Sequence, residues 1–179
     1  IHAPARLELG AEGAARVLVE REPRRREVGG GVAGGDVAEV DHRDQGSRRR
    51  EQQVRRVQVA VLNGVNLDVL GDRDPALYGG LSLGELETRI YRWAREQGFT
   101  ARCFQTNHEG QFVEWCHDAR GWAGGLIVNP GAWSHYSYAI RDALELCAVP
   151  VVEVHLSDIE QREEWRRHSV ISDVVAHRI

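Results

Sequence analysis

From Val57 to its last residue the chain alternates strand-like and helix-like segments, and this alternation constrains the fold more than any other feature. Short apolar runs rich in β-branched residues and bounded by turn signals are typical of buried strands. Such runs predict strands at 57–63, 99–106, 124–129 and 149–155, with a last strand beginning at 174. Helices are predicted between them at 82–98, 111–120, 136–146 and 160–167. The alternation predicts an α/β fold with a parallel sheet covered on both faces.

Residues 1–54 differ from the rest of the chain. They contain no aromatic residue and are rich in Arg, Gly and Glu, as in "REPRRRE" and "GGGVAGGD". A segment of this kind buries too little apolar surface to offset the entropy of ordering it. We therefore expect a disordered extension at 1–54 and a folded domain at 55–179. An RNA-binding arginine arm is the alternative, but the interleaved acids and the missing aromatics argue against it.

The charge and composition exclude several classes of function. The 179 residues carry a net charge of -4, which does not favour nucleic acid or an anionic membrane as a partner. All 23 basic residues are Arg, so an imine on a lysine and the phosphate-binding lysine of a P-loop are excluded. The three cysteines have no metal-type spacing, and their odd number argues against a disulfide framework. With no signal peptide or membrane span in the sequence, we expect a cytoplasmic protein.

Ligands of parallel α/β folds bind beyond the carboxyl ends of the strands. This rule selects the loops at 63–80, 106–110, 129–135 and 155–159. In the first loop, "GDRDPALYGG" places Arg73 five residues before Tyr78. A nearby cation favours the ionised form of a phenol and would make Tyr78 a usable base. Packing of Tyr78 with a solvated Arg73 is the competing interpretation, and the loop by itself favours that one.

The second and third loops are less specific. "NHEG" at 107–110 is best explained by a turn that opens a helix, because Glu favours a helix N-terminus. "NPGAWSH" ends a strand with Asn129 and leads through His135 into a helix, whose free N–H groups suit an anion. A Ser-His-Asp hydrolase using Ser134 or Ser137 is disfavoured because no GxSxG elbow is present.

The fourth loop follows "VEVH", where Glu153 and His155 alternate and should share one face of a strand. A carboxylate orients an imidazole and favours its protonated form, which makes His155 a candidate general acid. Arg162 and Arg166 lie four residues apart, as on one helical face, and could close over hydroxyls or a carboxylate. A carboxylated polyol is the ligand class that these groups favour.

Metal and dinucleotide sites lack their motifs. The eight histidines include no HxH or HxxxH, and no GxGxxG follows a predicted strand. The missing motifs argue against a metal site and against a dinucleotide cofactor.

Taken together, the four loops resemble the signature blocks of type II 3-dehydroquinate dehydratases in order and spacing. The matching stretches are "NGVNLDVLGDRDPALYG", "QTNHEG", "NPGAWSHYSYAIRDAL" and "VPVVEVHLSDIEQREEWRRHS". The resemblance implies a flavodoxin-like three-layer sandwich with a parallel five-stranded sheet, here with the last helix missing. It also implies elimination of water from 3-dehydroquinate, through an enolate and without a cofactor, in the shikimate pathway.

The resemblance also implies roles for single residues. Tyr78 matches the general base, and Arg73, on a loop that closes as a lid, matches the residue that keeps this base ionised. His155, held by Glu153, matches the general acid, and Asn66 matches the residue that positions a water to stabilise the enolate. The positions that match substrate-binding residues are Asn129, His135, Asp142, Leu156, Ser157 and Arg166. Asp142 is expected to come from a neighbouring subunit, because the family assembles as trimers gathered into dodecamers.

Some positions depart from the family pattern. Val65 stands where Pro is usual and Asp158 where Asn is usual, and Tyr136 and Tyr138 replace smaller residues. Two other functions remain open from the sequence. One is a non-catalytic flavodoxin-like module that binds a flavin or nucleotide, and the other is an inactive, C-terminally truncated relative that serves as an interaction partner.

Overall fold

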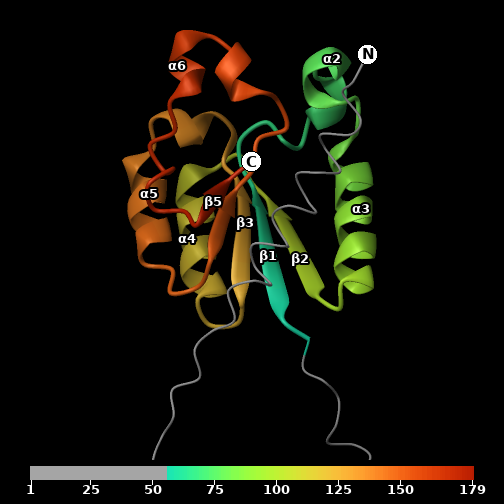
Figure 1. The fold of residues 1–179 in the computed structure, drawn as a ribbon, viewed down its shortest axis with the longest axis vertical. Coiled ribbons are helices and arrows are strands. Elements are labelled where there is room, and N and C mark those ends of the chain that lie inside the picture. Colours follow the sequence, from blue (N-terminus) through green and yellow to red (C-terminus); the bar gives the residue numbers. More distant parts are fainter. Residues whose placement is uncertain (1–55) are drawn as a thin grey trace, which may run out of the picture.

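The computed structural model describes residues 56–179, so the extension predicted at 1–54 lies outside the described residues. Residues 56–179 form an α/β fold around one parallel five-stranded sheet of order β2-β1-β3-β4-β5 (Figure 1). The strands are β1 (Gln58–Asn63), β2 (Thr100–Gln105), β3 (Gly125–Asn129), β4 (Val151–Glu153) and β5 (His177–Arg178). The long helices are α3 (Leu83–Glu96), α4 (Glu109–Ala119) and α5 (Tyr138–Glu145). The predicted fold class is confirmed.

Five short helical elements lie in the loops that follow the strands. They are η1 (Leu70–Asp72), α2 (Pro75–Tyr78), η2 (Gly131–His135), η3 (Ile159–Gln161) and α6 (Glu164–Arg167). α2 and α6 stand beyond the carboxyl-end edge of the sheet on its two sides, α2 above α3 and α6 above α4 and α5 (Figure 1). No helix within residues 56–179 combines the length and the apolar character needed to cross a bilayer.

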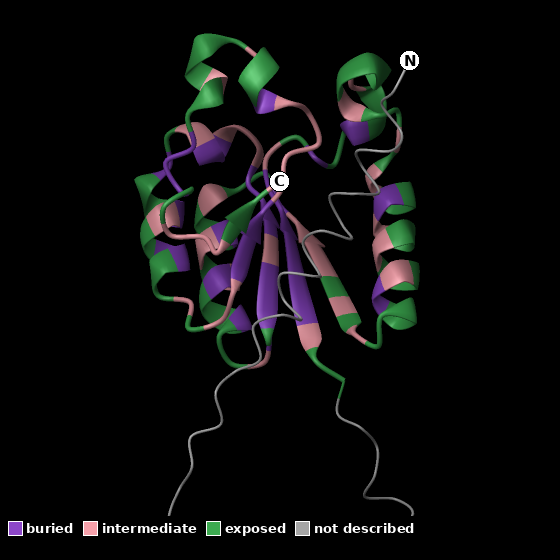
Figure 2. Ribbon diagram, in the orientation of Figure 1, coloured by how far each residue is buried: buried purple, intermediate pink, exposed green. Residues whose placement is uncertain are grey.

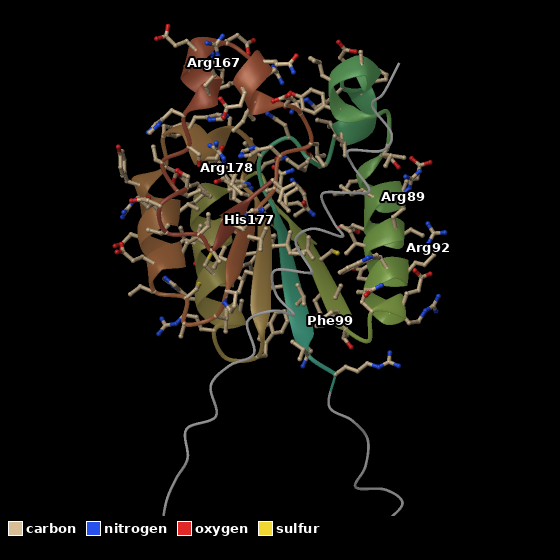
Figure 3. All side chains as sticks on the ribbon, viewed as in Figure 1. Arg89, Arg92, Phe99, Arg167, His177 and Arg178 are labelled. Carbon is tan, nitrogen blue, oxygen red and sulfur yellow. The ribbon has the colours of Figure 1, made fainter. Side chains whose placement is uncertain are left out.

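The helices form a layer on each face of the sheet. α4 and α5 cover one face and α3 lies on the other (Figure 1). Burial is concentrated in β1, β3 and β4 and on the helix sides that face them (Figure 2). Leu62, Phe112 and Ile140 are fully buried in the main core cluster. On α3, Arg89 and Arg92 point away from the sheet (Figure 3).

The N-caps of the helices set where they begin. Ser82 and Glu85 form the predicted capping box, in which the Ser82 N–H donates to Glu85 Oε2 at 2.9 Å. The helix start predicted at 111 is two residues late, because α4 begins at Glu109, and the start predicted at 136 is two residues early. Ser137 Oγ accepts the Ile140 N–H at 3.0 Å and begins α5 at Tyr138.

The single helix predicted at 160–167 is wrong, because the segment divides into η3 and α6. Asp158 Oδ1 accepts the Glu160 N–H at 3.2 Å and begins the first of these elements. Arg162 is then extended, with φ -94° and ψ -178°. Arg162 and Arg166 therefore do not share a helical face, and the i,i+4 argument for pairing them fails.

The loops after β1 and β3 are in backbone contact through two glycines. The Gly64 N–H donates to Asn129 O at 2.8 Å, and a Cβ at Gly64 would overlap the carbonyl group of Pro130. Conversely, a Cβ at Gly131 would lie 2.8 Å from Val65 O, and Gly131 has a φ of +65°. Each loop thus needs a glycine where it meets the backbone of the other.

Candidate active site

A cavity opens at the carboxyl-end edge of the sheet, where the loops after β1, β3 and β4 converge. With its open mouth it encloses about 620 Å³. Its polar lining comes from Asn66, Arg73, Tyr78, Asn129, His135, His155, Ser157, Arg162 and Arg166. One phenol, two imidazoles and three guanidinium groups therefore line the same cavity. Such a lining suits an anionic, hydroxylated ligand.

Tyr78 is held between two arginines in this cavity. Arg73 donates a hydrogen bond to the Tyr78 hydroxyl oxygen, and its Cζ lies 4.0 Å from the centre of the ring. Arg162 Nη1 donates to the same oxygen at 3.1 Å. The hydrogen bond to Tyr78 is the largest cause that raises the pKa of Arg162 above its ordinary value, and Glu163 adds to it. Two guanidinium groups therefore donate to the same phenol oxygen.

Arg162 connects the first and fourth loops. Its Nη1 also donates to Ser157 Oγ at 3.1 Å, so one guanidinium holds Tyr78 and the loop after β4 together. Glu163 forms ion pairs with two of the arginines. Its Oε2 lies 3.4 Å from Arg162 Nε and 2.8 Å from Arg166 Nη1. Arg166 in turn lies over the Trp165 ring, with Cζ 4.2 Å from the ring centre.

Glu153 and His155 form a buried pair, as their alternation predicted. His155 Nε2 lies 2.7 Å from Glu153 Oε1, and the Glu153 side chain is fully buried at the end of β4. A carboxylate can only accept here, so Nε2 carries a proton and Nδ1 is the atom left to hold a second one. The ring of His155 also stacks on that of His135, with centroids 6.1 Å apart.

His135 is fixed by the segment that follows α6. Its Nδ1 lies 2.8 Å from the carbonyl oxygen of His168, so Nδ1 donates and Nε2 is free to accept from a ligand. Burial lowers the pKa of His135, and the positive fields of His155 and Arg166 lower it further. The His168 carbonyl and Glu153 oppose this shift in the pKa of His135. A neutral His135 at pH 7 follows.

We expect acid to destabilise the fold partly through His135. Its folded-state pKa lies below the ordinary 6.5, so as the pH falls through 6.5 the unfolded chain takes up the proton first. The free energy of unfolding then decreases, and the loss is complete below the folded-state pKa. Urea unfolding at about pH 7 and about pH 5 should show a smaller decrease for His135→Asn than for the wild type.

The matched control for this experiment is His117→Asn, because His117 is an exposed histidine on α4. It should keep the full pH dependence of the wild type. An unchanged pH dependence in His135→Asn would contradict the assignment of this effect to His135.

Asn66 is placed by a small polar cluster. Its φ is +66°, an uncommon conformation for a residue with a side chain. The Asn66 N–H donates to Asn107 Oδ1 at 2.8 Å, and Asn107 Nδ2 donates to Asp68 Oδ2 at 2.8 Å. "NHEG" therefore does more than open α4, because its asparagine holds the loop that carries Asn66.

The predicted site residues fall into two groups. The lining of the cavity includes Asn66, Arg73, Tyr78, Asn129, His135, His155, Leu156, Ser157 and Arg166. Glu153 lies behind His155 rather than in the lining, and Asp142 is an exposed residue of α5 that does not line the cavity. Its predicted role from a neighbouring subunit stays a prediction.

Two side-chain contacts of the site were not predicted from the sequence. Arg162 was noticed as a ligand clamp, but its contact with Tyr78, 84 residues away, depends on tertiary structure. Ser169 donates to Glu153 at 2.6 Å from the last position of the fourth block, to which no role was assigned. Arg162 and Ser169 both lie in the fourth signature block, and this is the sequence signal that could have pointed to their contacts.

Chemically, the cavity offers a base and an acid without a nucleophile. A phenol between two guanidinium groups can accept a proton, and a carboxylate-bound imidazole can deliver one. Arg166, Asn129 and His135 supply donors and an acceptor for a polar ligand. This combination suits proton abstraction coupled to loss of a hydroxyl.

The sequence of this chain matches a known protein family. Residues 57–179 match the family described as Dehydroquinase class II. A curated 3-dehydroquinate dehydratase of Halalkalibacterium halodurans is 47% identical over 121 residues, which span 68% of this chain and 83% of that protein. 3-Dehydroquinate dehydratase 2 of Pseudomonas aeruginosa is 50% identical over 116 residues, 65% of this chain and 78% of the relative.

Solved structures agree with the sequence matches. The crystal structure of type II dehydroquinase from Butyrivibrio crossotus has a TM-score of 0.67 and 37% identity, covering 69% of this chain and 87% of that one. The type II dehydroquinase from Propionibacterium acnes has a TM-score of 0.66 and 43% identity, covering 68% of this chain and 84% of that one.

Proposed function

The chain belongs to the class II dehydroquinase family, and on that premise we propose that it removes water from 3-dehydroquinate to give 3-dehydroshikimate. The observation that carries the proposal is the single cavity that presents Tyr78 with two arginines and His155 with Glu153. The family match favours this lyase over a non-catalytic flavodoxin-like module or an inactive relative. Within the shikimate pathway, the product leads on to chorismate and the aromatic amino acids.

In the first step, the ionised Tyr78 oxygen takes the proton from the carbon beside the substrate ketone. The electron pair of the broken C–H bond moves onto the ketone oxygen and forms an enolate. Arg73 and Arg162 stabilise the tyrosinate before the transfer. Asn66 positions a water that donates a hydrogen bond to the enolate oxygen, where negative charge develops.

In the second step, the enolate collapses and the C–O bond to the leaving hydroxyl breaks. His155 delivers a proton to this hydroxyl, which departs as water. Glu153 orients the imidazole and stabilises its charged form before the transfer. The next cycle requires that the proton on Tyr78 return to solvent and that His155 regain one, so that the net reaction is loss of one water molecule.

The substrate carries a carboxylate and several hydroxyls, and the remaining groups of the cavity suit them. Arg166, Asn129, His135, and the backbone of Leu156 and Ser157 bind these groups. Asp142 of a neighbouring subunit completes the site in a dodecamer that is built from trimers. We further propose that residues 55–179 are the catalytic domain, that 1–54 form an extension to it, and that the enzyme works in the cytoplasm.

The direct test is the growth of enone absorbance after addition of 3-dehydroquinate, because the product conjugates its new double bond with the ketone. Appearance of the enone at a rate proportional to protein concentration is expected. Well-folded protein that forms no enone, while binding 3-dehydroquinate in calorimetry, would overturn the lyase in favour of a binding module.

A further inference from the structure

We propose that Ser169 is a positioning residue, which fixes the one oxygen of Glu153 that holds His155; the inference rests on the proposed function. Ser169 lies beyond α6 and is 3% exposed. Its Oγ lies 2.6 Å from Glu153 Oε1, the same oxygen that lies 2.7 Å from His155 Nε2. Serine, carboxylate and imidazole thus form a chain that leads from the core into the cavity.

The direction of the serine hydrogen bond is set by its neighbours. The Ile171 N–H lies 3.4 Å from Ser169 Oγ and points to it as a donor. Because a hydroxyl has one proton, and a carboxylate oxygen accepts, the Ser169 O–H is directed at Glu153 Oε1. The interaction is short and charge-assisted, which places it among the stronger hydrogen bonds in proteins.

Glu153 needs this second donor because its other oxygen has none. Oε2 is buried without a hydrogen-bond partner among residues 56–179. Without Ser169, the carboxylate would be held only by the imidazole that it is meant to orient. It could then rotate, so that either of its oxygens faces His155. Ser169 therefore fixes the geometry of the acid, whereas Glu153 contacts the acid directly.

The same stretch of chain also holds the second histidine of the cavity. The carbonyl oxygen of His168 accepts from His135 Nδ1 at 2.8 Å, one residue before Ser169. His135 and His155, whose rings stack, are thus both fixed from residues 168 and 169. This arrangement gives the "HS" pair of "RRHS" a role in aligning two imidazoles.

The test compares Ser169→Ala with the wild type in the enone assay. We expect kcat to fall about 10- to 100-fold, as when the outer partner of a functional imidazole is removed, with KM within about threefold of the wild-type value. Ser169→Thr, which keeps the hydroxyl, should restore most of kcat. In proton NMR, the low-field signal of the His155 Nε2–H should move or broaden in Ser169→Ala and recover in Ser169→Thr.

Ser172→Ala is the matched control, because Ser172 Oγ donates to the Ser169 carbonyl oxygen at 3.0 Å and not to Glu153. It should keep kcat and the NMR signal. If Ser169→Ala does not fold, Ser169→Cys replaces it, since the thiol fills the space but donates weakly, and the same fall in kcat is expected.

Two outcomes would overturn the inference. In the first, the folded variant keeps wild-type kcat and an unmoved Nε2–H signal. In the second, kcat and KM change together with a loss of unfolding stability, which indicates a structural role only. An inactive wild type would contradict the proposed function instead, and the NMR comparison would still decide whether Ser169 orients the pair.

Discussion

Replacing Tyr78 with Phe is expected to lower kcat by about 10⁴-fold, the upper end of the range for loss of an acid or base. The change removes only the oxygen that accepts the proton and the two arginine hydrogen bonds. The ring stays in place, so the contacts that bind the substrate equally in the ground state and in the transition state are kept. KM should therefore remain within about threefold of the wild-type value. Enone formation at saturating substrate measures kcat, and calorimetry with 3-dehydroquinate measures binding.

Tyr91→Phe is the control for this change, because Tyr91 is a 45% exposed tyrosine of α3 that does not line the cavity. It should have wild-type kcat. A Tyr78→Phe enzyme with more than about a tenth of wild-type kcat would exclude Tyr78 as the base, since a positioned base contributes about 10²-fold or more.

Replacing His155 with Gln is expected to lower kcat by about 10²- to 10⁴-fold, because no proton reaches the leaving hydroxyl from a neutral amide. The amide can still contact Glu153, so the buried carboxylate keeps a donor and the fold should persist. Product formation should become limited by the second step. Solvent-derived deuterium should then exchange into recovered 3-dehydroquinate faster than the enone forms, which mass spectrometry can measure.

His117→Gln, the same change at an exposed histidine of α4, should leave both rates unchanged. Loss of exchange together with loss of product in His155→Gln would place His155 in the first step and contradict its role as the acid.

The sequence predicted most of the fold because its signals are local. Apolar runs of strand length and the Ser82–Glu85 capping box set the main elements of the sheet and of α3. The boundaries of helices were predicted wrongly where polar side chains compete for backbone N–H groups. Ser137 begins α5 later than expected, and Asp158 begins a separate turn that leaves Arg162 extended.

The sequence predicted most of the residues that line the site, but not all of the contacts between them. Alternation on a strand predicted His155 beside Glu153. The loop at 63–80 by itself favoured a solvated Arg73, which is wrong, and the contact between Arg73 and Tyr78 was implied only by the family resemblance. The second guanidinium on Tyr78 comes from position 162, and no rule of local spacing joins residues 84 apart. Ser169 likewise reaches Glu153 only because the chain after α6 returns to the core.

The glycine contacts between the loops after β1 and β3 join two sides of the cavity into one unit. Gly64 and Gly131 leave no space between the two backbones, so these loops move as one body. Asn129 and Val65 are therefore held in a fixed position relative to each other. Substrate would meet this side of the cavity already formed, because backbone contacts between the two loops hold it.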